Sequence, residues 1–125
     1  ADFFISQVKL EKGDLAPVLD IERKPRSQAQ LQADLVKFLN RLEQHYGVKP
    51  IIYTSYKYMT RYLNTPEFDN YPLWIAHYYV DTLSYEGAWQ FWQHTDYGTV
   101  PGIDESVDLN VFNGSLDALQ RYTVK

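Results

Sequence analysis

The sequence predicts an α/β fold in which βα units are followed by three strands with few helices between them. In the first half of the chain, short apolar runs alternate with helical patterns, which is typical of a parallel sheet. In the second half, no long helical pattern separates the last three apolar runs. The five expected strands lie at residues 17–22, 50–54, 73–78, 89–94 and 107–112.

The first and last of these strands show the two kinds of strand signal. Residues 16–22 are a short apolar run bounded by Gly13 and Pro25, which indicates a buried strand. Residues 107–112 alternate apolar and polar side chains, as a strand with one exposed face does. No internal repeat, low-complexity segment or linker is visible, so we expect one domain or part of one.

The clearest helix is expected at residues 28–46. Ser27 followed by Gln30 matches a capping box, an apolar stripe runs along one face, and Gly47 can end the helix. Three weaker helical patterns lie at residues 1–10, 55–63 and 115–122.

Composition excludes several classes of function. The net charge of −4 argues against nucleic acid as a partner, since nucleic-acid-binding domains usually carry a basic patch. The chain has no cysteine, which excludes disulfides and cysteine-based metal or nucleophile chemistry. No apolar run approaches about 18 residues, so no membrane span is expected, and no signal peptide is visible.

Asp20 and Glu22 form the first constellation that could carry chemistry. In a strand, residues two apart point to the same face, with Cα atoms about 6.5–7 Å apart. Repulsion and lost hydration raise the pKa of one of two such carboxyl groups, and general acid catalysis needs one protonated and one ionised acid. The alternative is that both acids lie past the strand end in water.

Asp108 and Asn110 form a second polar pair on one face of a strand. They point away from the core or into the mouth of a barrel, or they belong to an Asx turn that leads into residues 113–114. Both interpretations stay open.

Aromatic side chains make up 16% of the chain, which fits either a ring-rich core or a groove that binds sugars. Tyr53, Tyr78 and Trp92 lie near the ends of expected strands, where barrel active sites gather, and Gln93 could hydrogen-bond a substrate hydroxyl or amide. The alternative for all of them is packing, which we favour for Trp74.

Other kinds of site have no support in the sequence. The three histidines lack metal-ligand spacing, no serine sits in a nucleophile elbow, and there is no glycine-rich phosphate loop. Hydrolysis by carboxylates is the chemistry that remains, without a metal or cofactor.

Five motifs in order resemble the family 25 glycoside hydrolases, which are muramidases. Together they cover nearly all of residues 3–114. They are VLDIE at 18–22, KPIIYTS at 49–55, YPLWIAHY at 71–78, FWQHTD at 91–96 and VPGIDESVDLNVFNG at 100–114.

The resemblance implies a TIM-like barrel and cleavage of the β-1,4 bond between N-acetylmuramic acid and N-acetylglucosamine in peptidoglycan. By position, Glu22 matches the proton donor, Asp20 the acid that orients or stabilises the substrate acetamido group, and Asp108 a late aspartate at the barrel mouth. The residues implied to bind substrate are Tyr53, Tyr78, Trp92, Gln93 and Asn110. Such an enzyme would act outside the cell, in the periplasm or in phage lysis.

The five expected strands would be the last five of the family's eight, so residues 1–125 are expected to be a partial barrel domain without its N-terminal strands. An early aspartate of the catalytic group would be missing with them. A separate chain segment or a second copy would then complete the sheet, or the chain would be an inactive truncated product. Two further hypotheses are a non-catalytic fragment that binds peptidoglycan and a barrel hydrolase that acts on another amino-sugar polymer such as chitin.

Overall fold

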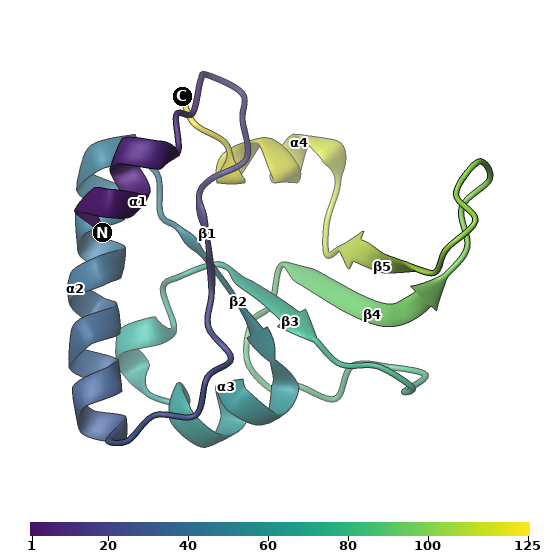
Figure 1. Ribbon diagram of the computed structural model, residues 1–125, viewed down its shortest axis with the longest axis horizontal. Coiled ribbons are helices and arrows are strands. Elements are labelled where there is room, and N and C mark those ends of the chain that lie inside the picture. Colours follow the sequence, from purple (N-terminus) through teal and green to yellow (C-terminus); the bar gives the residue numbers. More distant parts are fainter.

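A five-stranded sheet runs through the computed structural model, which describes residues 1–125 (Figure 1). The strands follow one another across the sheet in chain order. Strands β1 to β4 are parallel to their neighbours, and β4 and β5 are antiparallel. This confirms the α/β prediction. The strands are β1 (Val18–Asp20), β2 (Ile51–Ser55), β3 (Leu73–Ala76), β4 (Phe91–Gly98) and β5 (Val107–Phe112).

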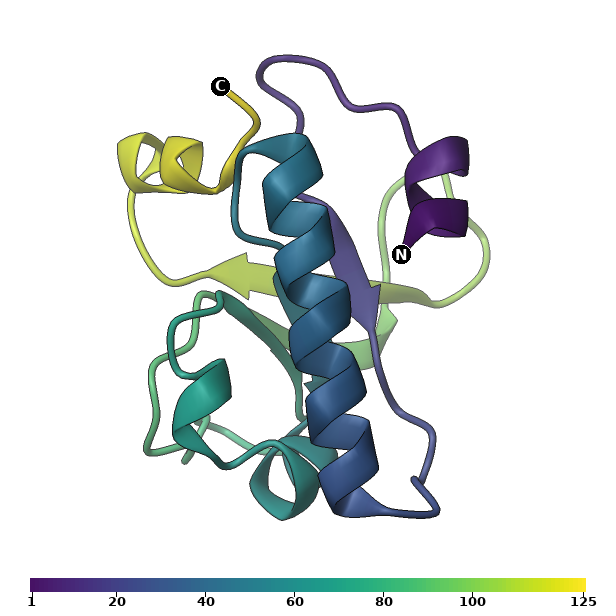
Figure 2. The same cartoon turned by 90° about the vertical axis from the view of Figure 1, so that its left-hand side faces the viewer.

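The longest helix, α2, spans Gln28–Tyr46 and lies across one face of the sheet (Figure 2). The Ser27 side chain accepts a hydrogen bond from the Gln30 N–H, and Gly47 ends the helix at a φ of 69°. Both ends match the predicted capping residues. The other helical segments are α1 (Asp2–Gln7), α3 (Tyr56–Tyr62), η1 (Pro66–Phe68), α4 (Leu116–Leu119) and η2 (Gln120–Tyr122).

The bounds of four strands differ from the sequence-based expectation, and the second strand is shifted by one residue, to Ile51–Ser55. The first strand ends at Asp20, the third ends at Ala76, and the fourth begins at Phe91 and runs on to Gly98. The closing helix at residues 115–122 divides into α4 and the 3-10 turn η2. Glu22 therefore lies beyond the end of its strand.

The two faces of the sheet have different roles. Ile52 and Ile75 point toward α2 and pack in the core with Leu39. Because side chains alternate along a strand, the residues next to Ile52 in β2 and next to Ile75 in β3 point to the opposite face. Asp20, Tyr53 and Trp74 lie in register on that opposite face, across β1, β2 and β3. We call it the open face, since Asp20 is exposed and Tyr53 and Trp74 are only partly buried.

β4 and β5 form a hairpin that extends away from the rest of the sheet (Figure 1). Two register shifts, between Gln93 and Thr95 and between Thr95 and Gly98, interrupt the ladder, and such irregularities bend and twist a strand. At Gly98 a Cβ atom would come within 2.4 Å of Leu109 Cγ, so the close approach of the two strands requires glycine here.

Candidate active site

Asp20 and Glu22 lie at the carboxyl end of β1, and both side chains are exposed on one side to solvent. The backbone between them stays attached to β2: the Ile21 N–H donates to the Tyr53 carbonyl over 3.0 Å, and the buried Thr54 hydroxyl donates to the Ile21 carbonyl. The chain therefore keeps its extended course past the strand end. The result is a pair of neighbouring carboxyl groups at the rim of the open face.

The pKa of Glu22 is raised above 4.5. The main cause is partial burial, because neighbouring atoms withdraw water from one side of the carboxyl group. The negative charge of Asp20 and a hydrogen bond with Asp20 add to the shift. Neither acid has a cationic partner within ion-pair distance, since the two ion pairs of the chain lie elsewhere. Glu22 thus keeps its proton to higher pH than an isolated glutamate does.

Gln93 is the centre of a hydrogen-bond network on the open face. Its side chain is only 5% exposed. Its Oε1 accepts from the Tyr53 hydroxyl over 2.7 Å and from the Tyr78 hydroxyl, and its Nε2 donates to Asp108 Oδ2 over 3.2 Å. One glutamine thus joins β2, the segment after β3, β4 and β5, and it brings together four residues that the sequence singled out separately.

The acid pair and this network face the same space. Burial is the main cause that raises the pKa of Tyr53, followed by Tyr78 and then by the charges of Glu22 and Asp20. The pKa of Tyr78 is also raised, first by burial, and the charges of Asp108 and Glu22 contribute. Both phenols therefore stay neutral and keep their hydroxyl protons. We use the name acid groove for the part of the open face that carries the acid pair and this network.

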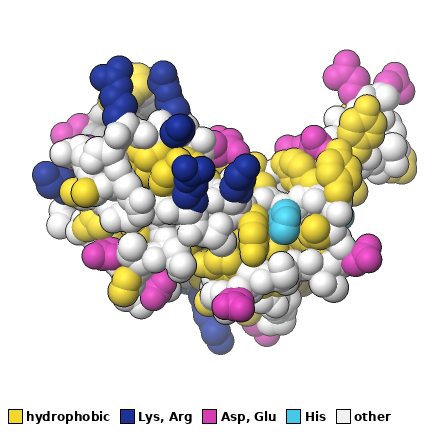
Figure 3. Space-filling view, turned by 90° about the horizontal axis from the view of Figure 1, so that it is seen from below, with side chains coloured by type: hydrophobic (Ala, Val, Ile, Leu, Met, Phe, Trp, Pro, Cys, Tyr) yellow, Lys and Arg dark blue, Asp and Glu magenta, His cyan; other side chains and the backbone are white.

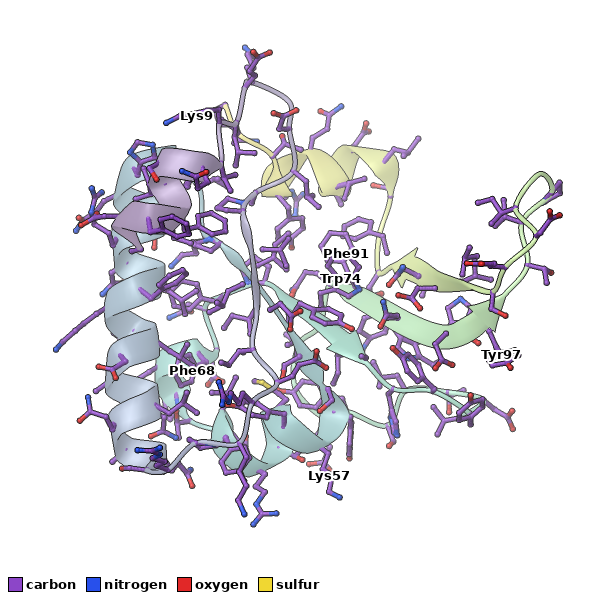
Figure 4. The ribbon with its side chains drawn as sticks, viewed as in Figure 1. Lys9, Lys57, Phe68, Trp74, Phe91 and Tyr97 are labelled. Atoms are coloured by element: carbon purple, nitrogen blue, oxygen red, sulfur yellow. The ribbon has the colours of Figure 1, made fainter.

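Trp74 also belongs to the open face, although sequence analysis favoured a packing role for it. Its indole Nε1 donates to Asn110 Oδ1 over 2.8 Å, and its ring meets the Tyr53 ring edge-on at 5.2 Å. Figure 4 shows Trp74 and Phe91 next to each other on the sheet, below α4 in this view. The position of Trp74 beside Tyr53 follows from the register of β3 with β2, and the pattern of a single strand does not contain that register.

The structure corrects the expected position of Trp92. Trp92 aligns with Ile75 and packs against the core cluster on the α2 side, and its Nε1 donates to the His77 carbonyl over 2.8 Å. Trp92 and Gln93 are consecutive strand residues, so their side chains point to opposite faces. Trp92 thus supports the sheet from behind and does not line the acid groove.

The histidines and acids nowhere form a cluster of three or more with the placement of metal ligands. His77 stacks on Tyr56 at 4.4 Å, and His94 contacts Trp92. None of the helices combines the length and the apolar character needed to cross a membrane.

Comparison with known proteins identifies the family. A family model described as "Glycosyl hydrolases family 25" matches residues 1–103. The "Uncharacterized protein YegX" of Escherichia coli K12 is 40% identical over 124 residues, which are 98% of this chain and 45% of that protein. The chain thus spans less than half the length of this curated relative.

Two solved structures show the same fold. A bacterial lysozyme from Streptomyces coelicolor superposes with a TM-score of 0.85 at 29% identity, over 98% of this chain and 63% of that one. A family 25 glycosyl hydrolase from Bacillus anthracis gives 0.83 at 30% identity, over 98% and 60%. The chain therefore belongs to glycosyl hydrolase family 25, and its five-stranded sheet corresponds to part of that family's (β/α) barrel.

Proposed function

We propose that the acid groove serves the hydrolysis of peptidoglycan at the β-1,4 bond between N-acetylmuramic acid and N-acetylglucosamine. One observation carries the proposal: Glu22, with its raised pKa, lies beside Asp20 and faces the network around Gln93. A carboxyl group whose pKa is raised keeps its proton to higher pH and can act as a general acid, and a neighbouring carboxylate can stabilise positive charge. Family membership and the structural likeness to a bacterial lysozyme support the substrate class.

In the proposed reaction, Glu22 donates its proton to the glycosidic oxygen as the bond from that oxygen to the sugar C1 breaks. The acetamido carbonyl oxygen of the same sugar attacks C1, and ionised Asp20 stabilises the oxazolinium ion that forms. Water then opens this ion and returns a proton to Glu22. This substrate-assisted route retains the configuration at C1. Direct attack by an activated water would invert it, so the anomer of the first product distinguishes the two routes.

The network around Gln93 is proposed to shape the sugar-binding surface. Tyr53 and Tyr78 present neutral rings and are fixed through their hydroxyl groups to Gln93 Oε1. Asp108 receives one hydrogen bond from Gln93 through Oδ2, and we propose that its remaining acceptor positions bind sugar hydroxyls or the acetamido N–H. Asn110 lies two residues after Asp108 on the same face of β5, accepts a hydrogen bond from Trp74 and borders the same surface.

A second candidate function is peptidoglycan binding without cleavage. The partly exposed open face favours it, because Tyr53 and Trp74 offer ring surfaces to sugars without any need for a complete set of acids. The chain spans only 45% of one curated relative and 60% and 63% of the two solved structures described above. We propose that further chain, from the same protein or a second copy, completes the sheet in the active form, and that these 125 residues alone hydrolyse cell wall weakly or not at all.

The test is release of reducing ends from purified peptidoglycan, measured together with retention of the protein on the insoluble wall. We expect Glu22→Gln to remove any hydrolysis without weakening retention, because the amide keeps the shape of the side chain but has no acidic proton to donate. Undiminished hydrolysis by Glu22→Gln would exclude Glu22 as the acid. Retention by the unaltered chain without any reducing ends favours the binding function.

A further inference from the structure

A pocket lies beside Glu22, between the segment that follows β1 and helix α3. Its volume is about 230 Å³. It is smaller than the roughly 300–1,000 Å³ of typical small-molecule sites, so it fits a side group of a polymer better than the polymer itself. We call it the basic pocket. It is lined by Glu22, Lys24, Ser55, Lys57, Tyr58, Arg61 and Tyr62.

The charge of the basic pocket is opposite to that of the whole chain. The chain carries −4, yet Lys24, Lys57 and Arg61 converge here with Glu22 as the one acid. The two ion pairs of the chain, Arg41–Asp2 and Lys49–Glu43, involve none of these residues. Figure 3 looks onto this end of the molecule and shows Lys and Arg side chains gathered on it, beside hydrophobic surface. Three cations that line one pocket and form no ion pair repel one another, and a bound anion would relieve that repulsion.

The walls of the pocket are held in place by packing and hydrogen bonds. Tyr58 is 5% exposed, and its hydroxyl donates to the Arg23 carbonyl over 2.9 Å, which attaches the segment carrying Lys24 to α3. The Arg61 guanidinium lies 5.3 Å from the centroid of the Tyr62 ring, a cation–π distance. Lys57 and Arg61 are four residues apart on α3 and share one side of the helix. The pocket is therefore preorganised on a helix and on a buried tyrosine.

The cations of the basic pocket form no ion pair with Glu22 or with any other acid of the chain. The pKa of Glu22 is raised by burial and by Asp20, and no cation of the pocket offsets this rise. The Lys24, Lys57 and Arg61 side chains also make no hydrogen bond within the chain that would occupy their donors. Glu22 thus belongs both to the acid groove and to the lining of the basic pocket.

We propose that the basic pocket binds an anionic group of the glycan substrate, a carboxylate or a phosphate, on the sugar next to the bond that Glu22 protonates. The inference rests on the proposed function, because it takes the glycan in the acid groove as the carrier of the anion. Lys and Arg donors form charge-assisted hydrogen bonds with both kinds of group. The pocket would select wall glycan over neutral amino-sugar polymers, which carry no anion at this position.

The test is retention of the 125-residue chain on insoluble peptidoglycan. We compare the double variant Lys57→Gln/Arg61→Gln with Lys12→Gln/Lys37→Gln, which removes the same charge from exposed lysines outside the pocket. The pocket variant should bind about five- to tenfold more weakly and lose most of its dependence on salt between about 50 and 500 mM NaCl, while the control matches the unaltered chain. Equal retention and equal salt dependence of the two variants would overturn the proposal, as would no retention of the unaltered chain. Circular dichroism checks that all variants are folded.

Two treatments of the wall identify the anion. Amidation of its carboxyl groups should abolish the difference between the two variants if the ligand is a carboxylate, and removal of its phosphate polymers should do so if the ligand is a phosphate. A difference that survives both treatments contradicts the assignment to either group. The two failures are distinguishable. If the acid role fails, Glu22→Gln releases as many reducing ends as the unaltered chain, and if the pocket fails, the pocket variant and its control are retained equally.

Discussion

Replacement of Gln93 tests the network that positions the acid groove. Gln93→Leu removes three hydrogen bonds, two accepted from tyrosine hydroxyls and one donated to Asp108. At about 1 kcal/mol each the loss is about 3 kcal/mol. The partners are only partly buried and can turn to water, and the leucine gains apolar burial. We therefore expect a decrease of about 1–2 kcal/mol in the free energy of unfolding.

Gln93→Glu asks a sharper question, because it keeps the shape and the acceptor but places a carboxylate beside Asp108. Two charges 3.2 Å apart repel by about 5 kcal/mol at an effective dielectric constant of about 20. Asp108 is exposed, so screening and proton uptake reduce the net cost to about 2–3 kcal/mol at neutral pH. In the variant, this repulsion acts only when both Asp108 and the new carboxyl group are ionised. The variant is therefore least stable at high pH, and stability returns as pH falls toward the ordinary carboxyl range.

Urea unfolding followed by circular dichroism measures both variants at about pH 4.5 and pH 7. Gln44→Glu on the exposed face of α2 is the matched control and should change stability by less than about 0.5 kcal/mol. If Gln93→Glu were as stable as the unaltered chain at pH 7, Gln93 would not face Asp108 and the network would be wrong.

Three further outcomes are expected. Gly98→Ala should destabilise the chain by about 1–3 kcal/mol in urea unfolding, because the new methyl group meets Leu109, whereas Thr99→Ala next to it should be nearly neutral. Glu22→Gln should gain stability relative to the unaltered chain as pH rises. Because the folded state raises the pKa of Glu22, protonated Glu22 contributes fully to the free energy of unfolding below about pH 4.5, and this contribution is lost as pH rises through the folded pKa. Thermal unfolding of both proteins at pH 4 and pH 7 measures the difference. In any protein that contains this chain and hydrolyses cell wall, kcat/KM should fall as pH rises through the pKa of Glu22, and Asp20→Asn should move that fall to lower pH. An unchanged pH profile in Asp20→Asn would show that Asp20 does not raise the pKa of Glu22.

Local patterns sufficed for features decided within one element. The ends of α2 followed from Ser27 and Gly47, and the spacing of Asp20 and Glu22 put both acids at one rim although the strand ends between them. The spacing of Asp108 and Asn110 likewise put both side chains on the open face of β5.

Features that depend on strand register could not be derived in this way. Gln93 became the centre of the network only through the pairing of β4 with both neighbours, and Trp74 joined the open face through its register with Tyr53. Trp92 is different, because the alternation of side chains along a strand already forbids Trp92 and Gln93 from sharing a face. The basic pocket combines both cases: Lys57 and Arg61 share a helix side that the sequence contains, whereas Lys24 joins them only through the tertiary fold.

A titration of the Glu22 carboxyl carbon by NMR, in the unaltered chain and in Asp20→Asn, tests the central claim most directly. We expect a midpoint above 4.5 in the unaltered chain and a lower midpoint in the variant, since the charge of Asp20 is then gone while partial burial remains. A midpoint at or below 4.5 in the unaltered chain, or the same midpoint in both proteins, would contradict the claim that Asp20 raises the pKa of Glu22.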